Sequence, residues 1–272
     1  MGRTLAVANQ KGGVAKTTTV AGLGAVLADA GLRVLLVDLD PQACLTFSLG
    51  TEPEERDADV TQVVLGGLAA PEAVRHVPVP RRRGRSAASE PVLDLLPATL
   101  DLAGAEESLQ PLPRREFRLR EALAGVLASS YDVVVVDCSP SLGLLTVNAL
   151  AAADEVVVPV QPEILAHRGV GQLLDTVDDV RHLLNPRLRV RGLLPTMVDT
   201  RTAHTRAVLA DLAGRYGEPV LEPWIPRSVR FPEASALGVP LPWASPASSG
   251  AGAYRQVGAR LLQSWRAEDA AA

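Results

Sequence analysis

Short apolar runs alternate with stretches of helical spacing along most of the chain, and this alternation limits the fold more than any other feature. The run DVVVVD at 132–137 carries four consecutive valines, and EVVVPV at 155–160 is almost as apolar. A strand without polar alternation is typical of a parallel sheet that is covered on both faces. Helical spacing after such runs predicts repeated strand–helix–strand units. We therefore expect an α/β fold with a mostly parallel, twisted sheet and helices on both faces.

The expected elements cover most of the sequence. The strands are predicted at 4–9, 33–38, 92–96, 132–137, 155–160, 189–196 and, briefly, 219–222. The helices are predicted at 17–30, 114–129, 142–152, 164–184, 203–216 and about 253–265. Residues 42–91 are less regular. Because no repeat and no linker is evident, we predict a single domain over 1–272, with a flexible Arg/Pro-rich insertion at 76–91 and a disordered tail at 267–272.

Composition argues against several classes of protein. No apolar run approaches the roughly 18 residues that a membrane span needs. Cys44 and Cys138 cannot form a disulfide framework, and we expect them to be inert, buried thiols. The four histidines lack the spacing of a zinc site. The first residues enter a strand at once, which leaves no room for a signal peptide. The low cysteine content fits a reducing compartment, so we expect a cytoplasmic protein.

The choice of basic residues singles out one loop. Of the 27 basic residues, only Lys11 and Lys16 are lysines, and both lie in NQKGGVAKTTT at 9–19. An ammonium is a compact charge that fits among phosphate oxygens, whereas a guanidinium is a broad fork. Glycines that turn backbone N–H groups inward before a helix form a phosphate cradle. The usual pattern G-x-x-x-x-G-K-[ST] fails at Gln10 and Ala15, but the loop still predicts a phosphate site.

Three aspartates follow apolar strands. Asp38 and Asp40 end the second expected strand, and Asp137 ends DVVVVD. Strand-ending aspartates are common turn formers, so each alone permits a purely structural role. In an open parallel sheet, however, ligands bind beyond the carboxyl ends of the strands. We therefore expect the three carboxylates to meet the loop 9–19 at one edge of the sheet.

Five segments together resemble the ParA family of chromosome and plasmid partitioning ATPases, whose phosphate loop is a deviant Walker A motif. They are NQKGGVAKTTT, LLVDLDPQ at 35–42, VVVVDCSPSLG at 133–143, MVDTRT at 197–202 and IPRSVRFPEASALG at 225–238. The resemblance implies a P-loop NTPase fold with ATP and Mg²⁺ as cofactors. It also implies slow intrinsic ATP hydrolysis, since no arginine finger is evident.

The resemblance assigns roles within the phosphate loop. Lys16 would hold the β- and γ-phosphates, Thr17 would ligate Mg²⁺, and Thr18 would contact a phosphate. Lys11 would reach across a nucleotide-sandwich homodimer to the partner's ATP, and Gly12 would let the two backbones approach closely. The remaining loop contacts are Gly13, Val14 and Ala15. Ala15 stands where glycine is commoner, and its methyl group fits if the residue has a helical φ.

Roles outside the loop follow from the same resemblance. Asp38 and Asp137 would serve the metal through water, and Asp40 would orient the attacking water. Pro226 and its neighbours would contact the adenine.

The distribution of charge suggests a nucleic-acid partner. Residues 181–230 hold nine arginines against four acidic residues, although the whole chain has a net charge of −4. Binding of DNA without sequence preference is mostly phosphate neutralisation, so this segment is a candidate footprint. The resemblance implies double-stranded DNA contacts by Arg201 and Arg230, a ParB-like partner that stimulates hydrolysis, and a nucleoid-associated location. The cluster RRRGR at 81–85 could add a further contact.

Three alternatives stay open at this point. In the related MinD family a terminal amphipathic helix binds membrane, but we expect the stripe Tyr254, Val257, Leu261, Leu262 and Trp265 to pack in the core, without stable membrane association. A metabolic enzyme of the same fold, such as a ligase or amidase, would need its own catalytic set, which the sequence does not show. An orphan ParA-like protein that positions another cargo would carry the same motifs.

Overall fold

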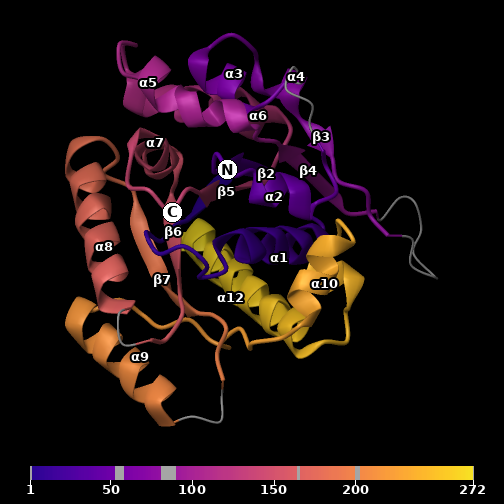
Figure 1. The fold of residues 1–272 in the computed structure, drawn as a ribbon, viewed down its shortest axis with the longest axis vertical. Helices are drawn as coiled ribbons and strands as arrows, with labels where there is room; N and C mark the ends of the chain where they lie inside the picture. Colours follow the sequence, from indigo (N-terminus) through magenta and orange to yellow (C-terminus); the bar gives the residue numbers. More distant parts are fainter. Residues whose placement is uncertain (1, 53–57, 81–89, 164–165, 200–202, 272) are drawn as a thin grey trace.

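The structure is a computed structural model, and it describes residues 2–52, 58–80, 90–163, 166–199 and 203–271. These residues form one sheet of seven strands in the order β3-β4-β2-β5-β1-β6-β7 (Figure 1). The strands are β1 (Arg3–Val7), β2 (Arg33–Leu39), β3 (Arg75–His76), β4 (Val92–Leu96), β5 (Val133–Cys138), β6 (Glu155–Val160) and β7 (Arg189–Pro195). Every neighbouring pair is parallel except β3 with β4. The predicted α/β class with a mostly parallel sheet is confirmed.

The valine runs form central strands because both of their faces are covered. Successive side chains point to opposite faces of a sheet. Val133 and Val135 of β5 pack with α1 and α12, whereas Val134 and Val136 pack with the helices on the other face. Each central strand therefore contributes apolar side chains to two separate hydrophobic clusters.

The helices divide between these two clusters. Side chains of α1 (Lys16–Asp29) and α12 (Ser249–Ala271) cover one face of the sheet, and these two helices lie side by side (Figure 1). The other face is covered by α3 (Val60–Leu65), α5 (Ala105–Leu109), α6 (Arg118–Ser129), α7 (Leu144–Ala152), α8 (Ala166–Leu183) and α9 (Ala203–Tyr216). The shorter helices are α2 (Cys44–Ser48), α4 (Ala70–Ala73), α10 (Arg230–Ala236) and α11 (Leu241–Ala244), with 3-10 turns at Leu100–Gly104 and Arg115–Phe117.

The irregular stretch 42–91 is more structured than its sequence indicates, because it contains α2, α3, α4 and β3. The flexible insertion does not begin at 76 as predicted. His76 belongs to β3, and Val77 is 1% exposed and donates its backbone N–H to Leu93. The arginine cluster 81–85 lies outside the described residues. The short strand expected at 219–222 is reduced to a bridge between Val220 and Leu193.

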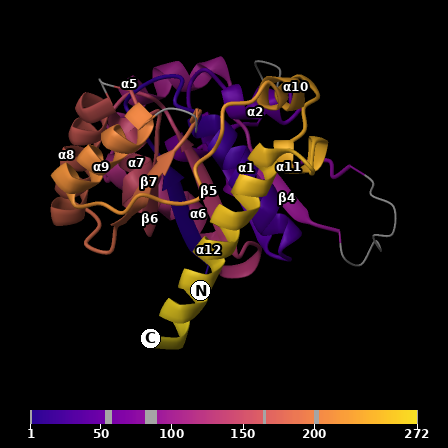
Figure 2. The ribbon, with the colours of Figure 1, turned by 90° about the horizontal axis from the view of Figure 1, so that it is seen from below.

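The predicted disordered tail at 267–272 is wrong for residues 267–271, which continue helix α12. The sequence shows no apolar anchor there, but two ion pairs hold the helix end. Arg3 donates to Glu268 at 2.8 Å and to Asp269 at 2.7 Å, which joins the two ends of the chain (Figure 2).

The apolar stripe of α12 packs in the core, as predicted. Tyr254, Val257, Leu261 and Trp265 are each at most 5% exposed. None of the described helices is long and apolar enough to cross a membrane.

Candidate functional site

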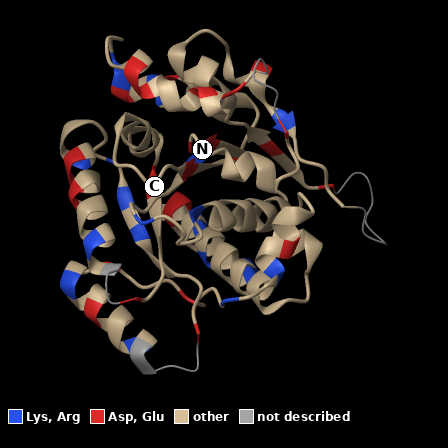
Figure 3. Cartoon of the chain, in the orientation of Figure 1, with Lys and Arg blue, Asp and Glu red and all other residues tan. Residues whose placement is uncertain are grey.

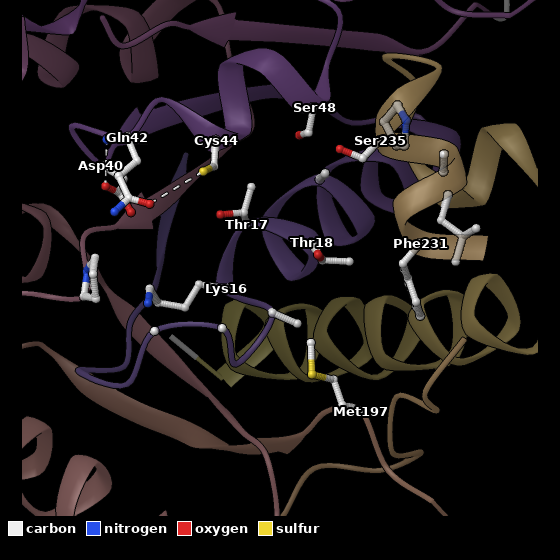
Figure 4. A pocket seen from close by; sticks show the side chains of 18 of the residues that line it. Lys16, Thr17, Thr18, Asp40, Gln42, Cys44, Ser48, Met197, Phe231 and Ser235 are labelled. Atoms are coloured by element: carbon white, nitrogen blue, oxygen red, sulfur yellow. Dashed lines mark hydrogen bonds between the residues drawn. The ribbon is translucent and has the colours of Figure 1, made fainter. Parts of the chain in front are cut away.

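A cavity of about 410 Å³ opens where β1, β2 and β5 end and α1 begins. The phosphate-loop side of its lining includes Gly12, Gly13, Ala15, Lys16, Thr17 and Thr18. Asp40, Gln42 and Cys44 line a second side, and residues of α10 and α11 line a third (Figure 4). The fold therefore brings the phosphate loop, Asp40 and the segment with Pro226 to one place, as the motifs predict. Val14 is buried and does not line the cavity.

The phosphate loop is fixed by contacts from two neighbouring strands. Asn9 donates its side-chain amide to the Pro159 carbonyl at 2.7 Å, at the end of β6. Beyond β7, the Thr196 hydroxyl donates to the Val14 carbonyl at 2.9 Å. Both contacts are buried, so they hold the loop over the helix N-terminus, where backbone N–H groups favour an anion.

Lys16 is the first residue of α1 and is 6% exposed. Burial lowers its pKa, while the carboxylates of Asp137 and Asp40 oppose that effect. Its ammonium donates to the Lys11 carbonyl at a long 3.3 Å. A buried ammonium with one weak hydrogen bond and a cavity beside it is suited to phosphate oxygens.

Ala15 differs from the expectation of a helical φ. It is the N-cap residue of α1 and has φ 65° and ψ 35°, in the left-handed region. This is the conformation that glycine adopts most readily, which explains why glycine is the usual residue in such loops. Gly13 also has a positive φ, of 73°. At Gly12 no atom lies within 4 Å of an added Cβ, so a side chain there would obstruct only a molecule outside this subunit.

Asp38 is fully buried and supports the loop that carries Asp40. One carboxylate oxygen accepts from the Thr46 backbone N–H at 2.9 Å and from its hydroxyl at 2.7 Å. The other accepts from the Asp40 backbone N–H at 3.2 Å. Burial raises the pKa of Asp38 to about 6, against the lowering effect of the Thr46 hydrogen bonds. Both oxygens are therefore engaged within the chain, and a role at the metal stays a prediction.

Asp137 is the register partner of Asp38 on β5 and is also fully buried. Neither of its oxygens has a hydrogen-bond partner among the described residues. Burial raises its pKa well above the usual value, and the nearby Asp38 charge adds to this, while the Lys16 charge opposes it.

An unpaired buried carboxylate is costly unless a cation or a donor satisfies it. Asp137, next to the Thr17 hydroxyl, thus fits a hydrated Mg²⁺. Magnesium keeps several waters and needs only one or two protein ligands. The described part of the chain contains no cluster of three or more His, Cys, Asp or Glu side chains suited to a metal.

Asp40 lines the cavity and is 8% exposed. One of its oxygens accepts from the Gln42 backbone N–H at 3.0 Å, which fixes the carboxylate at the cavity wall. Cys44 also lines the cavity and is exposed, so the expectation of two buried thiols holds only for Cys138. Position 44 is uncovered because it begins a short helix at the mouth of the cavity.

A second, smaller cavity of about 170 Å³ adjoins the first. Its lining includes Pro226, Met197, Phe231 and Tyr254, and is mostly apolar. Met197 and Phe231 line both cavities and come from different segments (Figure 4). The volume and the apolar walls suit a planar base. Sequence reasoning named Pro226 but missed Met197, Phe231 and Tyr254, although the first two lie within motifs of the resemblance.

Lys and Arg are spread over several elements of the chain (Figure 3), and the described arginines of 181–230 come from α8, β7, α9, α10 and the loops between them. Arg191 is engaged in an ion pair with Glu155 at 3.2 Å, at the end of the sheet away from the cavity. Arg230 is exposed and pairs with Glu233 at 2.9 Å within α10. Arg201 lies outside the described residues, so its contact with DNA stays a prediction.

Known proteins resemble this chain over nearly its full length. The family model described as "AAA domain" matches residues 2–190. The chromosome-partitioning ATPase Soj of Thermus thermophilus is 45% identical over 261 residues, which cover 96% of this chain and 95% of that protein. The chromosome partitioning protein ParA of Caulobacter vibrioides is 40% identical over 271 residues, which cover 99% and 97%. The chain belongs to the ParA/Soj family.

A solved structure shares the fold of this chain and bears on the ligand. Cobyrinic acid a,c-diamide synthase of Mycobacterium smegmatis matches with a TM-score of 0.83 and 49% identity, over 98% of this chain and 96% of that one. Structures of that protein hold ADP with magnesium and an ATP analogue with magnesium. The ParA/Soj chain described here thus has a single-domain fold of the P-loop ATPase type, in agreement with the prediction from its motifs.

Proposed function

We propose that this protein is an ATP-dependent, dimerising ATPase that partitions DNA in chromosome or plasmid segregation. The observation that carries the proposal is the different placement of its two lysines. Lys16 lines the cavity beside Asp137 and Asp40, whereas Lys11, in the same loop, does not line it. One ammonium would then serve the ATP of its own subunit, and the other would serve the ATP of a second subunit.

The cavity supports hydrolysis by positioning rather than by covalent chemistry. Lys16 and the loop N–H groups would hold the phosphates, and Asp40 would orient a water. Thr17 and Asp137 would hold Mg²⁺, which supplies charge neutralisation when bound. No arginine is among the described residues that line the 410 Å³ cavity, which supports a slow intrinsic rate. A slow rate suits a nucleotide that acts as a timer for assembly.

The ATP-bound dimer would bind double-stranded DNA without sequence preference, through Arg201 and Arg230. A ParB-like protein would stimulate hydrolysis and release the DNA, in a cytoplasmic protein that associates with the nucleoid. Support comes from the family resemblance and from the excess of arginine in 181–230.

The assembly step is tested with Asp40→Ala. This variant should bind ATP but hydrolyse it poorly, so that a dimer persists. Sedimentation velocity with saturating ATP and Mg²⁺ should show dimers, and Lys16→Ala should show none because it loses tight ATP binding. A strictly monomeric Asp40→Ala protein at high concentration would contradict the proposal.

The DNA step is tested separately in the ATP-bound state. Arg230→Glu should weaken DNA binding and flatten its dependence on salt, because one phosphate contact is lost. If affinity and salt slope match those of the unaltered protein, Arg230 does not contact DNA.

A second candidate arises from the diamide synthase at 49% identity. Amide synthesis would require a carboxylate acceptor and a source of nitrogen besides ATP. A direct assay of this chain with cobyrinic acid, a nitrogen donor and ATP would detect such an activity. DNA-dependent ATP turnover without amide formation would favour the partitioning function. The α12 stripe is buried and so is not available as a MinD-like membrane helix.

Capture of partners by the ATP-locked protein would distinguish a ParB-like partner from another cargo.

A further inference from the structure

The side chain of Lys11 points away from the cavity beside its own phosphate loop and toward Glu163. Its backbone N–H donates to the Asn9 side-chain oxygen at 2.9 Å, which fixes the main chain. Its side chain is absent from the lining of the cavity that Lys16 enters. Instead the Lys11 ammonium lies 2.6 Å from a carboxylate oxygen of Glu163.

Glu163 reaches Lys11 because of the strand order. It lies three residues beyond the end of β6, and β6 is the parallel neighbour of β1, which leads into the phosphate loop. Helix α8 closes the same side, since a Cβ at Gly169 would lie 3.1 Å from the Asn9 side-chain oxygen and 3.6 Å from Lys11 Cβ. The Lys11 backbone is thus confined between two elements, and only its long side chain retains freedom.

Charged groups lie on two sides of the Lys11 backbone. The carboxylates of Asp40 and Asp137 and the Lys16 ammonium act on one another at the cavity. Glu163 provides an anion outside the cavity, with its side chain 50% exposed and that of Lys11 35% exposed. An ammonium has three donors, so Lys11 can keep Glu163 and still donate to a phosphate oxygen.

We propose that Glu163 is a positioning residue that holds the Lys11 ammonium outside its own cavity and presents it to the phosphates of a second subunit. This inference rests on the proposed dimer. Ordering a lysine side chain in advance removes part of the entropy cost of association. Because the ion pair is exposed, its loss should weaken dimerisation by about two- to five-fold.

The first measurement compares variants in the Asp40→Ala background with saturating ATP and Mg²⁺. Glu163→Gln should raise the dimer dissociation constant about two- to five-fold in sedimentation equilibrium. The matched control is Glu121→Gln on α6. Glu121 forms an equally short, exposed ion pair with Arg114, at 2.6 Å, and the substitution removes the same charge. The control should leave the dissociation constant unchanged.

The second measurement needs neither nucleotide nor a dimer. Since the chain has only two lysines, reductive ¹³C-methylation gives two lysine side-chain signals besides the N-terminus. Glu163→Gln should shift the Lys11 signal and leave Lys16 in place, and Glu121→Gln should move neither. A purely structural role of Glu163 would not single out Lys11.

The outcomes separate this inference from the function on which it rests. An unmoved Lys11 signal overturns the inference and leaves the dimer intact. An unchanged or lower dimer dissociation constant also overturns it, because Glu163 would then have no effect on dimerisation or would oppose it. If the Asp40→Ala parent forms no dimer, the proposed function fails, and the positioning role fails with it even where the Lys11 signal moves.

Discussion

Replacing Ala15 with glycine should stabilise the protein, which is unusual for a residue that begins a helix. Ala15 has φ 65°, and the left-handed conformation costs a non-glycine residue about 1–2 kcal/mol. Relief of this strain is partly offset, because glycine gives the unfolded chain more conformational entropy to lose, which costs about 0.4–1 kcal/mol. The net gain should be about 0.5–1 kcal/mol. With an unfolding entropy of about 2.1 cal/mol/K per residue over 272 residues, the midpoint of thermal unfolding should rise by about 1–2 °C.

The assay is calorimetry of the nucleotide-free protein beside a control of opposite sign. Ala25 lies in the interior of the same helix and is fully buried, so Ala25→Gly should cost about 1 kcal/mol or more. If Ala15→Gly destabilises the protein as Ala25→Gly does, the left-handed assignment is wrong. Ala43 has φ 51° at the start of α2, and the same reasoning predicts a gain from glycine there.

Three further changes test other parts of the molecule. Lys16→Ala should reduce ATP affinity at least about ten-fold in calorimetric titration, since a charge-assisted hydrogen bond to phosphate contributes about 1.5–3 kcal/mol. Gly22→Ala should cost about 1–2 kcal/mol despite the better helix former, because the new Cβ would lie 2.7 Å from the buried Tyr254 ring, and thermal unfolding measures the loss. Glu268→Gln should cost about 0.5–1 kcal/mol at pH 7, allowing for solvent screening of its pair with Arg3. The hydrogen bond from Arg3 lowers the pKa of Glu268 in the folded protein. The stabilisation is therefore present above the unfolded pKa of about 4.3 and is lost as the pH falls through the lower folded pKa. Urea unfolding of both proteins at pH 7 and pH 3 measures the difference.

The strands could be located from sequence because burial on two faces leaves a continuous apolar signal. The predicted 132–137 and 155–160 match β5 and β6 within one residue. Residues 42–91 lack such a signal, since their helices span only four to six residues. Helix α12 was predicted too short because its last turn is held by Arg3, which is distant in sequence.

The phosphate loop and its carboxylates could be identified from residue types and spacing, but their individual states could not. Asp38 and Asp137 follow similar apolar strands, and sequence gave both the same role at a metal. The structure engages both oxygens of Asp38 with Thr46 and Asp40, and leaves both oxygens of Asp137 without a partner. The difference arises from the loop that follows each strand, and the hydrophobic pattern of the strands does not predict it.

The strand order explains why nucleotide binding should be strongly favourable at this site. Strand β5 lies between β2 and β1, so Asp137 has a strand on each side and is fully buried. Lys16, at the start of α1, is desolvated by burial, and no described ion pair neutralises it. Both charges carry an unfavourable burial energy that a magnesium ion and phosphate oxygens can offset. The apolar central strands and the helices that cover both faces of the sheet therefore leave both buried charges dependent on a ligand.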